Sequence, residues 1–347
     1  MPAQQHWTLA MASIKDVARL AEVSTATVSR YINDPELVKK GTREKVQAAI
    51  KATGYSLNTL ARNFRRGKSG IIFVVLPSIG DPFFSGVMSG LMKAAKQHKY
   101  SIVIREAKLD SLSAEQYNDM IISKQADGII LLASVYPFSD NFAKEQACDQ
   151  PIVLGCESVS SELNSFPNVR IDNYAAAKDA TEHLITLGHK RVAFIYGDKS
   201  STLTQDRERG FRDAMQEAGL QVPNYYLEEG GLSIGGARLA TTRLLAQVEK
   251  PTAIFCANDE MAIGCMHEVK TAKLRIPEDI SIIGFDDIRY AEVQDPPLTT
   301  IAQPTELIGK RVLLRLIDAI EGKDTAAKTE IIPHQLIMRK STAKATS

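Results

Sequence analysis

A short run near the amino end carries small polar residues at the spacing of a base-contacting helix surface. It reads Val-Ser-Thr-Ala-Thr-Val-Ser-Arg over residues 23–30. A helix start at Ser24 is expected, because its hydroxyl can accept hydrogen bonds from first-turn amides, and Val28 and Ile32 lie one turn apart on the predicted buried side. The opposite side offers hydroxyls, a methyl group and a guanidinium, which can reach base edges in the major groove of DNA. The residues predicted to contact DNA here are Ser24, Thr25, Ala26, Thr27, Ser29 and Arg30.

Two flanking helices are predicted to position this run. Residues 13–21 have a capped start and apolar residues at helical spacing, and residues 22–23 leave room only for a tight turn, so the two helices must cross steeply. A third helix is predicted with Thr42 as its N-cap and Gly54 as a left-handed C-cap. The pattern predicts a helix-turn-helix unit, although an ordinary three-helix miniature with a solvated polar face would show the same pattern.

Charge is distributed unevenly along the 347 residues. Residues 13–68 contain twelve Lys and Arg and five Asp and Glu, a net charge of +7, whereas residues 1–12 contain none. Since the whole chain carries +1, residues 69–347 carry −6. A basic head on an acidic body is expected when one end of a protein binds a polyanion such as nucleic acid. Chance clustering of surface lysines is the alternative.

The cysteine, histidine and hydropathy patterns narrow the class of protein. The four cysteines lie far apart without a Cys-x-x-Cys pair, which favours reduced and buried thiols, and no two histidines have metal-ligand spacing. We therefore expect no metal and no cofactor. Neither a run of eighteen apolar residues nor a secretory signal is present, so we expect a cytoplasmic protein that does not enter a membrane.

From residue 71 onward, strand-like runs alternate with helical stretches. The predicted strands are residues 71–76, 101–105, 128–133, 152–155, 192–196, 252–256 and 280–284, with helices between them such as 83–96, 175–187, 206–218 and 261–271. This alternation predicts parallel sheets covered by helices. There are too many strands for one small sheet, and residues 170–173 have the character of a crossover, which suggests two similar lobes.

Several segments together resemble the headpiece of the lac repressor (LacI) family. They are residues 14–18, 23–30, 42–46, 54–55 and 58–62, and the likeness continues through most of the chain, most strongly to the branch that contains the cytidine repressors. The resemblance implies an all-α helix-turn-helix headpiece followed by an α/β effector domain of two lobes. In that fold, which is like a periplasmic binding protein, helices cover both faces of parallel sheets.

The resemblance also implies domain boundaries. Residues 1–12 are expected to form a disordered tail, 13–57 the helix-turn-helix DNA-binding domain, 58–69 the hinge helix or linker, and 342–347 a second tail. The effector-binding and dimerisation domain is expected at 70–341, with lobe one at 70–172 and 303–331 and lobe two at 173–302 and 332–341.

The hinge segment is short, and a helix of two turns is marginal in water by itself. A flexible basic linker is therefore the alternative. In the family, the matching segment orders when two copies meet on the operator, and an apolar residue wedges into the minor groove. By position that residue is Phe64, where family members mostly carry leucine. The expected DNA contacts of this segment are Asn58, Leu60, Ala61, Arg62 and Phe64.

Ligands of open α/β sheets bind at the carboxyl ends of strands, and the resemblance implies an effector cleft there. Phe83 and Phe84 offer stacking faces, with a role in the core as the alternative. Arg207 matches a family arginine that bonds effector oxygens, with a surface salt bridge as the alternative. Asn258 could bond a hydroxyl, cap the next helix, or both. Asp286 matches a family carboxylate that accepts two ligand hydroxyls, unless it only serves a turn.

Two positions depart from the purine- and nucleoside-binding members of the family. Leu232 stands where those members usually carry an aromatic residue, so a stacked base would lose its platform. Ser201 stands where the purine-binding member carries an arginine. Both a nucleoside and a sugar therefore remain open as the effector. The predicted effector contacts are Phe83, Phe84, Ser201, Arg207, Leu232, Asn258 and Asp286.

Three classes of function are distinguished by these features. The leading hypothesis is a transcriptional repressor, whose homodimer would place two recognition helices on a palindromic operator in double-stranded DNA. Its small-molecule effector would bind between the lobes and change the affinity for DNA. The alternative is a solute-binding receptor without a DNA-regulatory role, which the basic head and the missing signal disfavour. An enzyme is not expected, because no G-x-S-x-G, H-E-x-x-H or strand-following G-x-G-x-x-G motif occurs.

Overall fold

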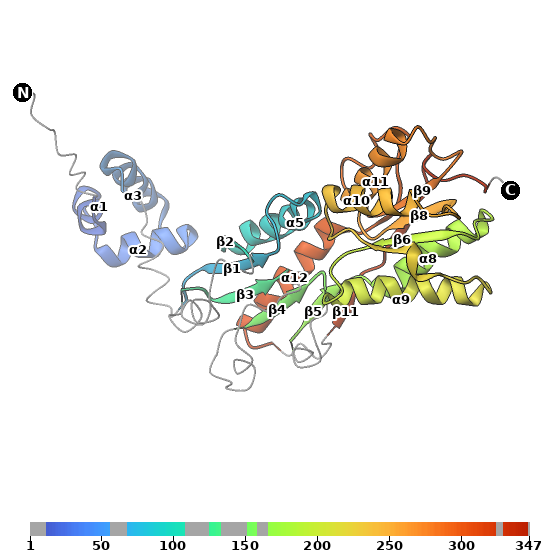
Figure 1. Ribbon diagram of the computed structural model, residues 1–347. Coiled ribbons are helices and arrows are strands. Elements are labelled where there is room, and N and C mark those ends of the chain that lie inside the picture. The colour runs from blue at the N-terminus through green and yellow to red at the C-terminus, as the bar shows by residue number, and fades with distance from the viewer. Residues whose placement is uncertain are drawn as a thin grey trace, which may run out of the picture. The chain divides into compact units, whose positions relative to one another are not determined.

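The structure is a computed structural model that describes residues 12–55, 68–107, 125–132, 151–157, 166–323 and 329–345. The chain divides into two compact units, with the division between Lys68 and Ser69. The first unit is helical and the second combines helices with two sheets (Figure 1). The predicted fold class, a helical headpiece with a two-sheet α/β body, is confirmed.

The helical unit follows the predicted helix-turn-helix order. Its elements are α1 (Ile14–Leu20), α2 (Thr25–Asn33), the 3₁₀ turn η1 (Pro35–Leu37) and α3 (Lys40–Thr53). Ser13 caps α1 in a reciprocal capping box with Asp16, which satisfies two backbone amides that the helix itself leaves unpaired. Gly54 ends α3 with a φ of 63°, as predicted for a left-handed cap. The buried core residues of this unit are Val17, Ala18, Ala21, Val28, Val46 and Ala49.

The predicted start of the third helix was wrong. Thr42 is the third residue of α3, and the N-cap is Lys39, which makes no capping bond through its side chain. The chain turns earlier because Arg43 ties the first turn of α3 to η1. Its Nη1 donates to Glu36 Oε1 at 2.7 Å, and its backbone N–H donates to the carbonyl of Lys39 at 2.9 Å.

The first sheet of the second unit is parallel throughout, in the order β11-β5-β4-β3-β1-β2. Its strands are β1 (Ile71–Leu76), β2 (Ser101–Glu106), β3 (Gly128–Leu131), β4 (Ile152–Gly155), β5 (Asn168–Arg170) and β11 (Thr329–Ile331). The strands β1, β3 and β4 are apolar and almost wholly buried, which is expected of a parallel sheet covered on both faces.

The second sheet has the order β12-β10-β9-β8-β6-β7, and only β12 is antiparallel to its neighbour. Its strands are β6 (Val192–Tyr196), β7 (Leu227–Glu229), β8 (Ala253–Cys256), β9 (Ser281–Asp286), β10 (Thr299–Ala302) and β12 (Gln335–Ile337). The chain thus passes between the sheets three times: after β5, after β10 and after β11. Carboxyl ends of strands from both sheets can therefore face one site.

Helices cover the second sheet on both faces. The pair α8 (Asn173–Thr186) and α9 (Thr202–Glu217) packs together on one face, and α10 (Ile234–Leu245) and α11 (Asp259–Thr271) pack together on the other (Figure 1). The 3₁₀ turn η3 (Asn224–Tyr226) leads into β7. Phe211 of α9 stacks on Phe194 of β6 with ring centroids 5.1 Å apart, and Phe194 contacts Phe255 of β8 at 5.0 Å. This aromatic cluster fixes α9 on the sheet.

Two helices of the first sheet approach each other unusually closely. On α5 (Pro82–His98), a Cβ added to Gly90 would lie 1.9 Å from the backbone oxygen of Glu306 on α12 (Thr305–Ile320). Reciprocally, a Cβ at Gly309 of α12 would lie 1.9 Å from the backbone oxygen of Val87 on α5. Glycine is required at both positions, because no side chain fits between the two backbones. No helix within the described residues is long and apolar enough to cross a membrane.

Candidate functional site

The predicted DNA-contacting residues of the helical unit lie on the surface of α2. Ser24, Thr25, Ala26 and Arg30 are exposed, and Thr27 and Ser29 are half-buried. Val28 between them is fully buried, so it fixes the helix on the core and turns the other side chains outward. The Ser24 hydroxyl accepts a hydrogen bond from the Thr27 amide at 3.1 Å, which confirms the predicted cap.

The expected hinge contacts Asn58, Leu60, Ala61, Arg62 and Phe64 lie outside the described residues. The surface of α2 is therefore the part of the predicted nucleic-acid interface that can be described. It offers one exposed guanidinium and several small hydroxyl or methyl groups, which suits close contact with base edges.

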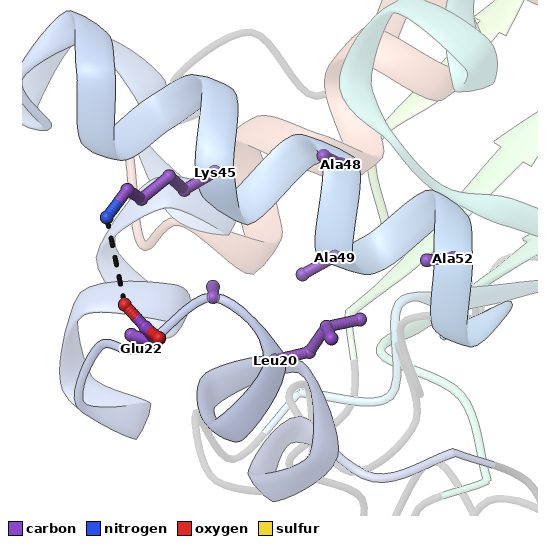
Figure 2. A pocket seen from close by; sticks show the side chains of 7 residues that line it. Leu20, Glu22, Lys45, Ala48, Ala49 and Ala52 are labelled. Carbon is purple, nitrogen blue, oxygen red and sulfur yellow. Dashed lines mark ion pairs between the residues drawn. The ribbon is translucent and has the colours of Figure 1, made fainter.

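A shallow hollow of about 380 Å³ lies elsewhere on the helical unit. Leu20 of α1 and Ala48, Ala49 and Ala52 of α3 form its apolar wall (Figure 2). At one end, Lys45 Nζ lies 4.0 Å from Glu22 Oε2. None of its lining residues belongs to α2, so this hollow is separate from the predicted DNA-contacting surface.

A second cavity, of about 110 Å³, lies in the α/β unit between residues of the two sheets. Six of the seven predicted effector contacts line it, whereas Ser201 does not. The lining residues are Pro77, Asp81, Phe83, Phe84, Cys156, Glu157, Leu203, Arg207, Leu232, Asn258, Asp286 and Gln303. The cavity is smaller than the 300–1,000 Å³ or so that is usual for small-molecule sites. A ligand of that usual size would therefore fit only if the walls moved apart.

Arg207 projects from α9 into this cavity and is only 4% exposed, which rules out the surface salt bridge as its role. Its Nε donates to Asn173 Oδ1 at 3.0 Å, and its Nη1 donates to the carbonyl of Ala257. Its Nη2 lies 3.8 Å from Asp286 Oδ1. The guanidinium is thus held in one orientation, with its charge directed towards the carboxylate.

Asp286 ends β9 and is 8% exposed. Its Oδ1 accepts a hydrogen bond from Gln303 Nε2 at 2.7 Å. Burial raises the pKa of Asp286 to about 7, although the charge of Arg207 acts in the opposite direction. Its φ of 113° is rare for a residue other than glycine, and such strain persists only where the surroundings enforce it.

The turn after Asp286 is held by side chains from two other segments. Buried Asp259, the first residue of α11, accepts from the Ile288 amide at 2.9 Å and from the Thr300 hydroxyl at 2.6 Å. Asp287 pairs with Arg339 at 2.7 Å. These bonds fix the position of the Asp286 carboxylate at the cavity.

Asn258 caps the next helix, as one of its two alternatives predicted, and it also lies at the cavity. Its Oδ1 accepts from the Met261 amide at 2.9 Å and so caps α11, while the residue also lines the cavity. Its Nδ2 donates to the carbonyl of Leu232 at 3.4 Å. Leu232 contributes an aliphatic wall, with a φ of 53°.

Phe83 and Phe84 have the predicted alternative role in the core, and they also lie at the cavity. Both are buried in the core of the α/β unit and both line the cavity. Their rings pack edge to face, with centroids 5.0 Å apart and an interplanar angle of 81°. Ser201, by contrast, occupies the N-cap position of α9, and its buried hydroxyl has no hydrogen-bond partner among the described residues.

Six lining residues were not predicted. They are Pro77, Asp81, Cys156, Glu157, Leu203 and Gln303. The strand-end rule could have found some of them, because Cys156 and Glu157 directly follow β4 and Gln303 follows β10. Asp81 caps α5 by accepting from the Phe83 amide at 2.9 Å. Within the described ranges, no group of three or more His, Cys, Asp or Glu is placed to hold a metal ion.

The sequence of the chain is similar to known families and proteins. Residues 13–58 match the model for "bacterial regulatory proteins, lacI family", and residues 181–342 match that for a periplasmic binding protein-like domain. The transcriptional repressor CytR of Escherichia coli K12 is 39% identical over 331 residues, which cover 95% of this chain and 96% of that protein.

Two solved structures extend the likeness. The lac repressor dimer bound to operator and the anti-inducer ONPF has a TM-score of 0.83 at 28% identity, covering 96% of this chain and 99% of that one. The complex of the transcriptional regulator CelR with cellobiose has a TM-score of 0.72 at 28% identity, covering 95% of this chain and 99% of that one. Both structures span helical and α/β units alike.

Proposed function

Because the chain belongs to the LacI family of bacterial regulatory proteins, we propose that it represses transcription from a palindromic operator under the control of a nucleoside or sugar. The observation that carries this proposal is the cavity in the α/β unit. It brings together Arg207 from α9, Asn258 from the start of α11 and Asp286 from the end of β9, next to two aromatic rings. A buried site in which polar groups converge beside apolar walls is suited to a small ligand.

The DNA-binding role rests on the helical unit. Residues 24–30 present an exposed polar surface on α2, and the segment 13–68 carries a net charge of +7. Phosphates attract such a unit without regard to sequence, and side chains on α2 supply the discrimination between bases. In a homodimer, two such helices meet two half-sites of the operator. In the proposed arrangement, residues 13–57 bind DNA and residues 58–69 connect them to the α/β unit. Residues 70–341 bind the ligand and form the dimer.

The ligand role rests on the chemistry of the cavity. A carboxylate, an amide and a guanidinium can bond ring or ribose hydroxyls, and the Phe83 and Phe84 rings offer an apolar face for a sugar or base. The similar transcriptional regulator CelR was solved with cellobiose, and the lac repressor was solved with operator and the anti-inducer ONPF. The lobes of the α/β body are taken as residues 70–172 with 303–331, and 173–302 with 332–341.

Regulation follows from the position of the cavity between the two sheets. A ligand that binds one arrangement of the lobes more tightly than another shifts the equilibrium between them. If the two arrangements space the paired headpieces differently, the affinity for the operator changes by the same coupling free energy.

The test uses the purified full chain and a pool of random duplexes selected by binding at low salt. The expected result is enrichment of a palindromic sequence, with affinity that falls steeply as salt rises. A thermal-shift screen of nucleosides, pentoses and hexoses should then identify a ligand that also changes operator affinity. Failure to bind any duplex at low salt, with or without ligands, would leave a solute-binding receptor as the better description.

A further inference from the structure

Within the proposed ligand site, we infer that the cavity takes a ligand with hydroxyl or amino donors and no phosphate, and that Asp81 and Glu157 exclude phosphorylated compounds. This inference rests on the proposed function and adds the charge class of the ligand to it. It also assigns a role to two residues whose sequence context did not predict one.

The charged groups of the cavity are unbalanced. Among the residues that the structure describes, three carboxyl groups line it, those of Asp81, Glu157 and Asp286, together with one cation, Arg207. Glu157 and Asp286 are each 8% exposed and Arg207 is 4% exposed, so water screens their interactions poorly. A ligand anion placed here would meet a surplus of negative charge.

The single cation is poorly placed to offset this surplus. Two sides of the Arg207 guanidinium are used by Asn173 and by the carbonyl of Ala257, and one face covers the Phe285 ring. Its Nη2 is directed at Asp286, at 3.8 Å. Arginine binds phosphate best through two parallel N–H donors. Here the paired donors already have protein acceptors, so one donor group at most is available to a ligand.

At two helix N-termini at the cavity, protein side chains already bond one of the first-turn amides. Free first-turn amides at a helix start are a common phosphate site. At α5, however, the Asp81 carboxylate accepts from the Phe83 amide, and at α11 the Asn258 side chain accepts from the Met261 amide. Asp81 therefore takes one donor that an anion could use and adds its own negative charge to the cavity.

The pKa shifts of these groups also indicate that the cavity disfavours further negative charge. Burial raises the pKa of Asp81, and the negative charge of Asp81 contributes to the raised pKa of Asp286. Burial lowers the pKa of Arg207, and the charges of Asp286 and Glu157 oppose that change. Hydroxyl or ammonium groups of a ligand would donate to these carboxylates, whereas a phosphate would increase the repulsion between like charges.

The experiment compares each unphosphorylated compound with its phosphate by isothermal titration calorimetry on the full chain. The probes are adenosine and AMP, cytidine and CMP, ribose and ribose 5-phosphate, and glucose with glucosamine and glucose 6-phosphate. For whichever parent compound binds, we expect its phosphate to bind at least about 100-fold more weakly. Each factor of ten in the dissociation constant corresponds to about 1.4 kcal/mol. The double variant Asp81→Asn/Glu157→Gln keeps the shapes and should narrow this ratio to below about tenfold.

The control is Asp295→Asn, which removes the same charge from a side chain that is 100% exposed and outside the cavity. It should leave the ratio unchanged. A phosphate that binds wild-type protein as well as its parent compound would overturn the inference, as would an unchanged ratio in the double variant. If the chain binds duplex DNA but no compound of either kind, the proposed ligand site fails together with this inference, while the DNA-binding role stands.

Discussion

The guanidinium carbon of Arg207 lies over the Phe285 ring, 3.6 Å from its centroid, and Phe285 directly precedes the cavity carboxylate Asp286. A planar guanidinium can stack on the ring and bond Asn173 at the same time, whereas a lysine ammonium cannot. We expect Arg207→Lys to weaken binding of the ligand found in the screen by about tenfold or more. Calorimetry should show this in a protein that remains folded by circular dichroism.

The matched control for Arg207→Lys is Arg209→Lys on the same helix. The side chain of Arg209 is 61% exposed and pairs with Asp206 on the surface. The same chemical change at this position should leave the dissociation constant unaltered. Equal loss of affinity in both variants would mean that the helix, and not the stacked guanidinium, is responsible.

A pH dependence of stability follows from Asp286. Its pKa is about 7 in the folded chain, against an ordinary value of 3.8, so between these values the folded state binds more protons than the unfolded state. Stability therefore falls as pH rises through this window, with a limiting slope of about 1.4 kcal/mol per pH unit, and levels off above it. Asp286→Asn removes this contribution.

The measurement is the difference in free energy of unfolding between Asp286→Asn and the wild type, by urea titration from pH 4.5 to 8. Because other carboxyls titrate in both proteins, only the difference isolates Asp286. The advantage of the asparagine variant should grow with pH and reach a plateau above about pH 7. A difference that is flat across the window would contradict the assignment.

The close approach of α5 and α12 makes a prediction about packing. Gly309→Ala would bring a methyl group against the backbone oxygen of Val87, which cannot move away without displacing α5. We expect a loss of about 3 kcal/mol, the upper range for overpacking, seen as a lower urea midpoint. Gly235→Ala is the control, because a Cβ there meets nothing within 4 Å, and it should change stability by less than about 1 kcal/mol.

Base reading by α2 is tested through Arg30, which is exposed beside small polar residues. We expect Arg30→Ala to lose discrimination at one base pair of each half-site, at about 1–3 kcal/mol per half-site. Quantitative gel shifts on single-base operator variants measure this. Arg19→Ala, which removes an exposed guanidinium from α1, serves as the comparison. A uniform loss of affinity across all sequences in Arg30→Ala would show that Arg30 contacts phosphate instead.

Seven of the twelve described strands, helices such as α8 and α11, and the convergence of strand ends could be predicted because they depend on local patterns. The strands β5, β7, β10, β11 and β12 were not predicted, because each has only three or four residues. Strands such as β1 and β4 are continuous apolar runs, and Ser13, Ser24 and Gly54 are residues suited to helix ends. The start of α3 could not be predicted, because it depends on the contact between Arg43 and Glu36 across a turn.

The polar groups that surround the cavity residues were harder to predict, since they come from distant parts of the chain. Asp286 is bonded by Gln303, seventeen residues later, and the turn after it by Asp259, twenty-nine residues before Ile288. From the sequence, Asp81 could be predicted only as a residue at the start of a helix. Its place opposite Arg207 depends on how the two sheets meet.

The strand order has a consequence for biosynthesis. Each sheet has an edge strand from the last part of the chain, β11 in the first and β12 in the second. While a ribosome is still translating the codons before residue 329, the nascent polypeptide has neither strand, and the edges of β5 and β10 stay uncovered. Premature termination anywhere upstream would thus leave both halves of the body open to intermolecular pairing, so a truncated product should precipitate or be degraded instead of persisting as a partial regulator.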